Sequence, residues 1–339
     1  MDNDLFADAA RQLLAGECTG AVVRAIEAGG RDAPESAALW QHIEAAGLPD
    51  ALLPEAEGGA GLGLSQVFGV LEQCGAHALP LPLADTMLAR ALLAAADVQR
   101  PAGSIALARG EPLADGGLRC VLVRGGRVAQ GVLVQAGDAW RLMAVAGAQE
   151  SPQALPLDAA CTWTAAQVQA APSIERDADA RTLQAAVLAP QMAGALAQVF
   201  QRTLQYANER QQFGRPIGKF QAIQHQLAVM SEHVFAARMA AQLGCSGAGW
   251  QPDRLRVATA KARCSEAALA VSELAHAIHG AIGFTAEYDL QLFTRRLHAW
   301  RQSAGSESYW HDVAGQALLA HEGMTLEMVR RIADVEVVL

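Results

Sequence analysis

One polar segment holds the residues best suited to binding a charged ligand. Residues 206–225 read YANERQQFGRPIGKFQAIQH, with Arg210 near the start. A guanidinium presents a planar fork of N–H donors that pairs two phosphate oxygens at once, so Arg210 suits a phosphorylated ligand. Taken alone, Arg210 is equally well explained as a solvated charge at the end of a helix. The residues around Arg210 are therefore needed to choose between these two interpretations.

A second segment, residues 279–290, reads HGAIGFTAEYDL and contains Gly280 and Gly283. Glycine lacks a Cβ and therefore lets the backbone approach a ligand closely. The simpler alternative is an ordinary helix C-terminus. His276 and His279 lie one turn apart just before it, but no Cys or carboxylate shares their spacing. We therefore expect helix-face or site-lining histidines and no metal site.

These segments must be positioned by helices, because the apolar residues around them recur with helical spacing. The clearest pattern is Phe220, Ile223, Leu227, Met230 and Val234. Similar patterns cover residues 183–204, 257–278 and 290–300. Pro190 interrupts the first of them and should kink that helix or mark its start. Four helices in succession predict an antiparallel bundle.

The part of the chain before these helices contains two further types of sequence pattern. Residues 1–98 predict helices joined by turns, with Asp85 expected to cap a helix over 86–95. Short apolar runs at 104–108, 119–123 and 131–134 lie between turns and predict a small antiparallel sheet or barrel. We therefore expect a mostly α protein of three domains: an N-terminal helical domain (1–98), a small middle β domain (99–177) and a C-terminal helical bundle (178–339).

The composition excludes several classes of protein. Hydrophobic residues make up 52% of the 339 residues and charged residues 18%, which suits a folded chain with a sizeable core. A net charge of -9 argues against nonspecific binding of nucleic acid or anionic membranes. No uninterrupted apolar run predicts a membrane span, and the N-terminus lacks a signal pattern. We expect a cytoplasmic protein whose six scattered cysteines are free and mostly buried.

The order of helices, small β domain and helical bundle resembles the acyl-CoA dehydrogenase fold. The segment 206–225 looks like that family's signature between two bundle helices, and 279–290 is similar to its second signature. The run Leu53-Pro54-Glu55 with the glycines at 58–61 more weakly resembles the turn in the family's first domain. The likeness is strong beyond Leu183 and faint in the middle of the chain.

The resemblance implies roles for individual residues. The family residue matching Arg210 binds the pyrophosphate and adenosine portion of FAD held by a neighbouring subunit. The aromatic matching Phe213 packs on that portion and the Gln matching Gln221 hydrogen-bonds it. Further expected cofactor contacts come from Gln212, Gly280, Gly283 and Ser306, and Gly305 is expected to contact the substrate. The implied reaction is α,β-dehydrogenation of an acyl-CoA, with FAD as cofactor and electron-transfer flavoprotein as acceptor.

The sequence departs from the family where the catalytic base is expected. The family's Glu-Gly-Thr motif falls on Ala304-Gly305-Ser306, and alanine cannot remove a proton. Glu307 is the nearest carboxylate and is either a displaced base or a first-turn residue favoured by the helix dipole. Some members place the base on an earlier helix, where Gln184 and Ala185 stand here. The Thr-Glu…Gly-Ser-Asp run and the Trp-Ile-Thr-like strand that cradle the isoalloxazine ring are also missing from the middle domain.

Three hypotheses follow from these departures. In the first, the chain is a subunit of a heteromer, contributes the adenosine side of the FAD site, and depends on a second acyl-CoA dehydrogenase-like subunit for the base. In the second, it is a homo-oligomeric dehydrogenase that uses Glu307. In the third, it is a non-catalytic structural or acyl-CoA-binding subunit.

Overall fold

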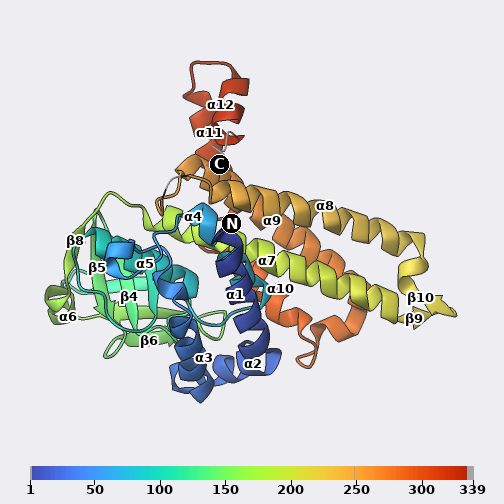
Figure 1. Cartoon of the computed structure of the whole chain (residues 1–339), viewed down its shortest axis with the longest axis horizontal. Helices are drawn as coiled ribbons and strands as arrows, with labels where there is room; N and C mark the ends of the chain where they lie inside the picture. Colours follow the sequence, from blue (N-terminus) through green and yellow to red (C-terminus); the bar gives the residue numbers. More distant parts are fainter. Residues whose placement is uncertain (1, 248, 334–339) are drawn as a thin grey trace. The chain divides into compact units, whose positions relative to one another are not determined.

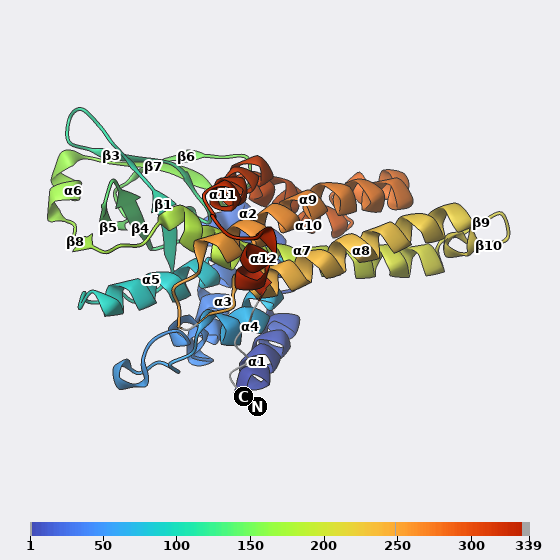
Figure 2. The ribbon, with the colours of Figure 1, turned by 90° about the horizontal axis from the view of Figure 1, so that it is seen from above.

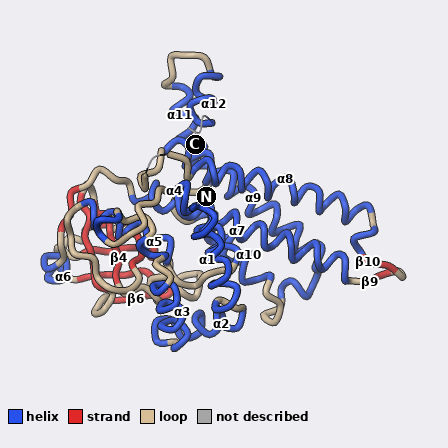
Figure 3. The backbone as a smooth tube through the Cα atoms, viewed as in Figure 1, coloured by secondary structure: helices blue, strands red, loops and turns tan. Residues whose placement is uncertain are grey.

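The computed structural model describes residues 2–247 and 249–333. The described residues divide into two compact units. The first unit combines Met1–Val70, Leu79–Val187 and Ala248–Gln251, and the second combines Leu71–Ala78, Leu188–Gly247 and Pro252–Leu339. Figure 1 labels the elements in chain order, and Figure 3 shows the strands gathered in the β region, apart from one short hairpin at the end of two long helices. The predicted mostly α fold with a small β domain is confirmed, whereas the boundaries of the three domains stay a prediction.

The helices of the first unit begin at residues that favour helix starts. The Thr19 side chain accepts a hydrogen bond from the Val22 N–H, and Pro34 occupies the first turn of its helix, where a missing N–H costs nothing. The helices of this part are α1 (Asp2–Glu17), α2 (Gly20–Gly29), α3 (Pro34–Ala45), the start of α4 (Leu64–Ala76), α5 (Leu83–Ala95) and α6 (Ala165–Ala170).

The expected helix cap at Asp85 is wrong. Helix α5 begins two residues earlier, after Pro82, and Asp85 is buried within its first turn. Its carboxylate accepts from Arg124 Nη2 at 2.7 Å and from the Leu107 N–H at 3.3 Å. A buried carboxylate needs such partners, and they come from the β region rather than from the helix end.

Two four-stranded sheets form the β region. The first has the order β1 (Ile105–Arg109), β4 (Gly131–Ala136), β5 (Ala139–Ala144) and β8 (Ser173–Glu175); the second has the order β2 (Glu111–Pro112), β3 (Leu118–Val123), β7 (Ala159–Trp163) and β6 (Gln149–Pro152). Buried apolar residues such as Val132, Met143 and Trp163 make one core from both sheets.

The pairing within these sheets corrects the prediction in one respect. Strands β1 and β4 are parallel, with Ile105 opposite Gly131, and the other pairs are antiparallel. The chain leaves β1, contributes β2 and β3 to the second sheet, and returns to the first sheet as β4. A crossover of this length permits a parallel pair, which short apolar runs cannot reveal.

The second unit contains the predicted bundle. Its helices are α7 (Ala180–Glu209, which begins in the first unit), α8 (Gln221–Gly244), α9 (Arg254–His279), α10 (Leu290–Gln302), α11 (Glu307–Leu319) and α12 (Thr325–Ala333). Helix α9 packs against α8, α10 and α11. Figures 1 and 2 show α7 and α8 running side by side to a hairpin, β9 (Gln211–Gln212) with β10 (Arg215–Pro216). Pro190 lies inside α7, ten residues after its start.

Two glycines let α4 and α7 pack backbone to backbone. A Cβ on Gly75 would lie 1.7 Å from the Gln191 carbonyl oxygen, and one on Gly194 would lie 1.9 Å from that of Glu72. No side chain fits at either position, so this contact depends on glycine. The six cysteines are buried and lie outside any disulfide, as predicted.

Two stretches, α7 and Arg254–Phe284, are long and apolar enough to cross a membrane by length and composition. In α7, 78% of the apolar window is buried within the protein, and in Arg254–Phe284 the share is 44%. Core helices of a bundle pass the same test, and α7 and α9 belong to the bundle. This signal therefore does not replace the expectation that the chain lacks a membrane span.

Candidate functional site

The segment around Arg210 forms a tight hairpin at the end of α7. Gln212 pairs with Arg215, and Phe213 and Gly214 make the turn with φ of 51° and 79°. Two consecutive positive φ angles match the two-residue turn that best fits strand twist. Phenylalanine adopts positive φ only at a cost, and its side chain here is 92% exposed. The hairpin therefore presents an aromatic ring to the surroundings at the expense of local strain.

The polar side chains of this hairpin also point outward. Arg210 is exposed, and among the described residues its side chain has no hydrogen-bond or ion-pair partner. Its backbone is fixed, since its N–H donates to the Tyr206 carbonyl and its own carbonyl accepts from the Ile217 N–H, both at 2.8 Å. The Arg215 guanidinium lies 4.3 Å from the centre of the Phe220 ring. The result is a rigid backbone that carries cationic donors available to a ligand.

Two glutamines accompany Arg210. Gln212 and Gln221 are both exposed, and neither makes a side-chain hydrogen bond to another described residue. Gln221 is the first residue of α8, beside Lys219. Amide donors and acceptors around a guanidinium suit a ligand that carries both phosphates and a base or sugar.

The glycine segment follows the end of α9. Gly280 has φ of 64° and ends the helix, and a short helical turn, η5 (Gly280–Phe284), follows. A Cβ on Gly280 would meet no other atom within 4 Å, so this side of the backbone is open. At Gly283 a Cβ would lie 3.1 Å from the His279 Cβ and 3.2 Å from His276 Nδ1. Gly280 therefore suits close approach by a ligand, whereas Gly283 serves internal packing.

The segment Ala304-Gly305-Ser306 forms a strained turn between α10 and α11. Ala304 has φ of 56° and Gly305 of 95°, and Ser306 caps α11 by accepting from the Tyr309 N–H. Trp310 Nε1 donates to the Ala304 carbonyl at 3.0 Å, and Lys261 Nζ donates to the Gly305 carbonyl at 2.9 Å. The turn keeps a defined shape, but the methyl group of Ala304 offers no proton acceptor.

Comparisons with known proteins agree with this geometry. Residues 181–319 match the family model of the acyl-CoA dehydrogenase C-terminal domain. The chain is 30% identical over 302 residues to acyl-CoA dehydrogenase IpdE2 of Mycobacterium tuberculosis, which covers 89% of this chain and 92% of that protein. The chain belongs to the acyl-CoA dehydrogenase family. Members of this family are FAD-dependent oxidoreductases that act on CH–CH bonds.

Two solved structures with the same fold are complexes of two different chains. A variant of the steroid ACAD Tcur3481–Tcur3483 has a TM-score of 0.78 at 25% identity, covering 94% of this chain and 97% of the other. The ChsE4–ChsE5 complex of Mycobacterium tuberculosis has a TM-score of 0.82 at 20% identity, covering 95% and 98%.

The residues at the hairpin fit one part of the family's cofactor. A free guanidinium, two exposed amides, an exposed aromatic ring and an open glycine backbone suit the pyrophosphate and adenosine of FAD. They lie on the hairpin after α7 and on the loop after α9. The flavin roles of Arg210, Gln212, Phe213, Gln221, Gly280, Gly283 and Ser306, and the substrate role of Gly305, stay predictions.

Glu307 is held by an ion pair. Arg301 Nε donates to Glu307 Oε2 at 3.1 Å, and Arg301 Nη2 pairs with the other oxygen. Burial raises the pKa of Glu307, but hydrogen bonds from Arg301 and from its own backbone N–H outweigh burial and leave the pKa below the ordinary value. A carboxylate with a lowered pKa is a weaker base, so this environment does not favour proton removal.

The alternative base position on α7 also lacks a carboxylate. Gln184 is buried, and its Nε2 donates to the Leu107 carbonyl at 2.6 Å. Ala185 is fully buried. Upstream, Asp179 caps the start of α7 by accepting from the Thr182 N–H at 3.0 Å. These residues therefore serve the packing of the first unit.

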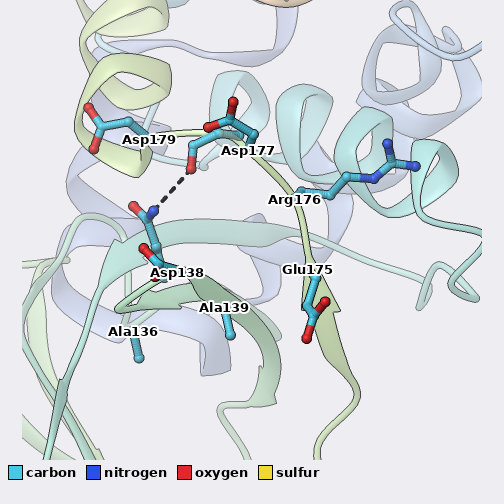
Figure 4. Close-up of a pocket in the computed structure, with 9 residues that line it drawn as sticks. Ala136, Asp138, Ala139, Glu175, Arg176, Asp177 and Asp179 are labelled. Carbon is cyan, nitrogen blue, oxygen red and sulfur yellow. Dashed lines mark hydrogen bonds between the residues drawn. The ribbon is translucent and has the colours of Figure 1, made fainter.

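An open pocket of about 670 Å³ lies beside Asp179 at the edge of the first sheet (Figure 4). Four carboxylates line it, those of Asp138, Glu175, Asp177 and Asp179, together with the single cation Arg176. A negative lining repels phosphates, so this pocket does not suit FAD or coenzyme A.

Sequence reasoning missed two residues that shape the site. Tyr206 stacks on His279 with ring centres 4.4 Å apart, and Lys261 is fully buried behind the Ala304 turn. The position of Tyr206, four residues before Arg210, was a usable signal because it places Tyr206 in the last turn of α7, one helical turn before the arginine of the motif. Lys261 gave no clear local signal, since the two backbone carbonyls that it holds at the turn, those of Arg301 and Gly305, lie 40 and 44 residues further along the chain.

Proposed function

We propose that this chain is a subunit of a heteromeric acyl-CoA dehydrogenase and contributes the adenosine side of an FAD site shared with a partner subunit of the same family. The observation that carries this proposal is the Arg210 hairpin, a strained element whose Arg210 side chain makes no hydrogen bond or ion pair among the described residues and whose Phe213 ring is exposed. The two-chain complexes among its structural relatives support the same reading.

In this proposal the work is divided between two chains. Arg210 pairs the pyrophosphate, Gln212 and Gln221 hydrogen-bond the adenosine end, and Phe213 packs against it. Bound FAD supplies the ring that accepts a hydride from the acyl chain. The partner supplies the isoalloxazine cradle and the carboxylate that removes the α-proton, because Ala304 stands at the position of the base here. Electron-transfer flavoprotein would serve as the acceptor that reoxidises the bound cofactor after each turnover, and we place the complex in the cytoplasm.

The relative named a steroid ACAD makes a steroid acyl-CoA the first substrate to test. The homo-oligomeric alternative requires Glu307 as base, which its ion pair with Arg301 disfavours. The structural alternative requires that no complex containing this chain binds FAD through Arg210.

The test is to purify the chain alone and together with a candidate acyl-CoA dehydrogenase-like partner chain from the same genome, and to measure bound flavin by absorbance. We expect flavin and turnover in the complex only, and loss of flavin with Arg210→Ala. A matched control is Arg119→Ala, which removes an exposed guanidinium from β3. Flavin and turnover in the chain alone would support the homo-oligomer. Equal flavin content in the wild-type and Arg210→Ala complexes would support the structural subunit.

A further inference from the structure

We infer that Tyr206 and His279 are positioning residues that join the Arg210 hairpin to the Gly280–Phe284 loop, so that both segments bind the adenosine end of FAD as one surface. This inference rests on the proposed function. It assigns a role to two side chains that lie behind the ligand-facing residues and are not expected to touch the cofactor.

Tyr206 holds the start of the hairpin through its backbone. It lies in the last turn of α7, and its carbonyl accepts the Arg210 N–H at 2.8 Å. Any shift of Tyr206 along or around the helix therefore moves the backbone of Arg210 directly.

Tyr206 also holds the start of the Gly280–Phe284 loop. Its ring stacks on the His279 imidazole at 4.4 Å between centres and 23° between planes, and its hydroxyl donates to the His279 carbonyl at 3.3 Å. Gly280 follows His279 immediately. A parallel stack combined with a hydrogen bond to the same residue restrains both the distance and the orientation between α7 and the end of α9.

His279 also holds the far end of the loop. Its Nδ1 lies 2.8 Å from the Ala275 carbonyl, and since a carbonyl only accepts, Nδ1 carries the proton. The Nε2 lone pair then accepts from the Tyr288 hydroxyl at 3.2 Å. Tyr288 lies just beyond the loop, so one imidazole connects both of its ends with α7. His279 is 4% exposed, which is typical of a supporting residue.

The first experiment measures this connection without any cofactor, by amide hydrogen exchange of the full chain. Tyr206→Leu removes both the stack and the hydroxyl, and we expect exchange roughly tenfold faster or more at residues 210–216 and at 280–284 alike. Tyr206→Phe keeps the stack and should speed exchange only about two- to fivefold. Gln201→Ala, at an exposed position of α7, is the matched control and should leave both segments unchanged.

The second experiment measures FAD affinity of the complex with its partner chain. We expect Tyr206→Leu to weaken FAD binding, Tyr206→Phe to restore most of it, and the loss to be smaller when Arg210→Ala is already present, because the two residues act together. If Tyr206→Leu does not fold, His279→Gln and Tyr206→Phe provide the same comparison.

The outcomes distinguish the positioning role of Tyr206 and His279 from the proposed role of Arg210 in binding FAD. Faster exchange in both segments with weaker FAD binding is the expected result. Unchanged exchange in either segment overturns the inference even if Arg210 binds FAD. Faster exchange with unchanged FAD affinity also overturns it and leaves Tyr206 a purely stabilising role. If Arg210→Ala leaves FAD affinity unchanged, the proposed function fails and the inference falls with it, whatever the exchange data show.

Discussion

The Arg210 hairpin and the Ala304 turn are both built on strained backbone, but their polar groups face opposite ways. At the hairpin, the Phe213 ring and the Arg210 guanidinium are exposed, while two backbone hydrogen bonds hold Arg210 in place. At the turn, the carbonyls of Ala304 and Gly305 accept from buried groups of the protein itself. The side chains of the hairpin are therefore available to a ligand. The turn has its polar backbone groups bonded within the protein, and it carries alanine where the family has its catalytic carboxylate.

Removing Lys261 should show that the turn is part of the stable core whereas the hairpin is not. Lys261 Nζ donates to the Arg301 and Gly305 carbonyls and to Ser265 Oγ. Lys261→Met leaves these buried acceptors without that donor and should lower the free energy of unfolding by about 3 kcal/mol. Chemical denaturation measures this value.

The matched change on the hairpin is Arg210→Ala, which should alter the free energy of unfolding by less than about 0.5 kcal/mol because its side chain is exposed. If both variants were equally destabilised, the distinction between a structural turn and a ligand-facing hairpin would be wrong.

Phe213→Gly should separate stability from assembly. Glycine adopts positive φ without strain, so the free energy of unfolding should rise by about 0.5 kcal/mol or stay unchanged. Association with the partner chain should weaken roughly tenfold, because the exposed ring is lost. Sedimentation of the mixed chains measures association. Tight association combined with lower stability would mean that Phe213 serves the fold of this chain.

Glu307→Gln should have the smallest effect on the function of the complex. The Arg301 and Glu307 side chains are 25% and 20% exposed, and ion pairs in contact with solvent contribute little, so we expect the free energy of unfolding at pH 7 to fall by less than about 1 kcal/mol. Turnover of the complex should stay within about fivefold, whereas loss of a general base lowers it roughly 10²-fold or more. Steady-state kinetics decide, and a hundredfold loss would restore Glu307 as the base.

The pH dependence of this pair has a defined sign. The folded protein lowers the pKa of Glu307 below the ordinary 4.5, so near that pH the folded state binds fewer protons than the unfolded state. The pair therefore contributes stability above pH 4.5 and loses it as the pH falls through the folded pKa. Glu307→Gln should remove this part of the acid dependence, measured as the difference between the two melting curves across pH 3–6.

The sequence predicted the helices well because their signal is local. The apolar spacing from Leu227 to Val234 defines one face of α8, and the same kind of pattern located α9 and α10. The runs at 104–108 and 131–134 marked true strands, but their parallel pairing depends on the path of the chain between them.

The residues of the candidate site divide in the same way between local and long-range signals. Arg210 and Phe213 stand in a contiguous motif, and Ala304 was visible as a missing carboxylate. The partnership of Tyr206 with His279 joins residues 73 positions apart, and the burial of Asp85 depends on Arg124, 39 positions away. Such contacts arise from packing between elements, which no periodicity within one element encodes.

The most direct test of the account is the flavin content of the purified complex with wild-type Arg210 and with Arg210→Ala, with the isolated chain measured beside them. The account predicts a full flavin spectrum for the wild-type complex, little flavin for the isolated chain, and FAD binding weakened about 10- to 100-fold by Arg210→Ala, as expected for losing charge-assisted hydrogen bonds. A full flavin spectrum with turnover from the isolated chain, or unchanged FAD affinity in the Arg210→Ala complex, would contradict it.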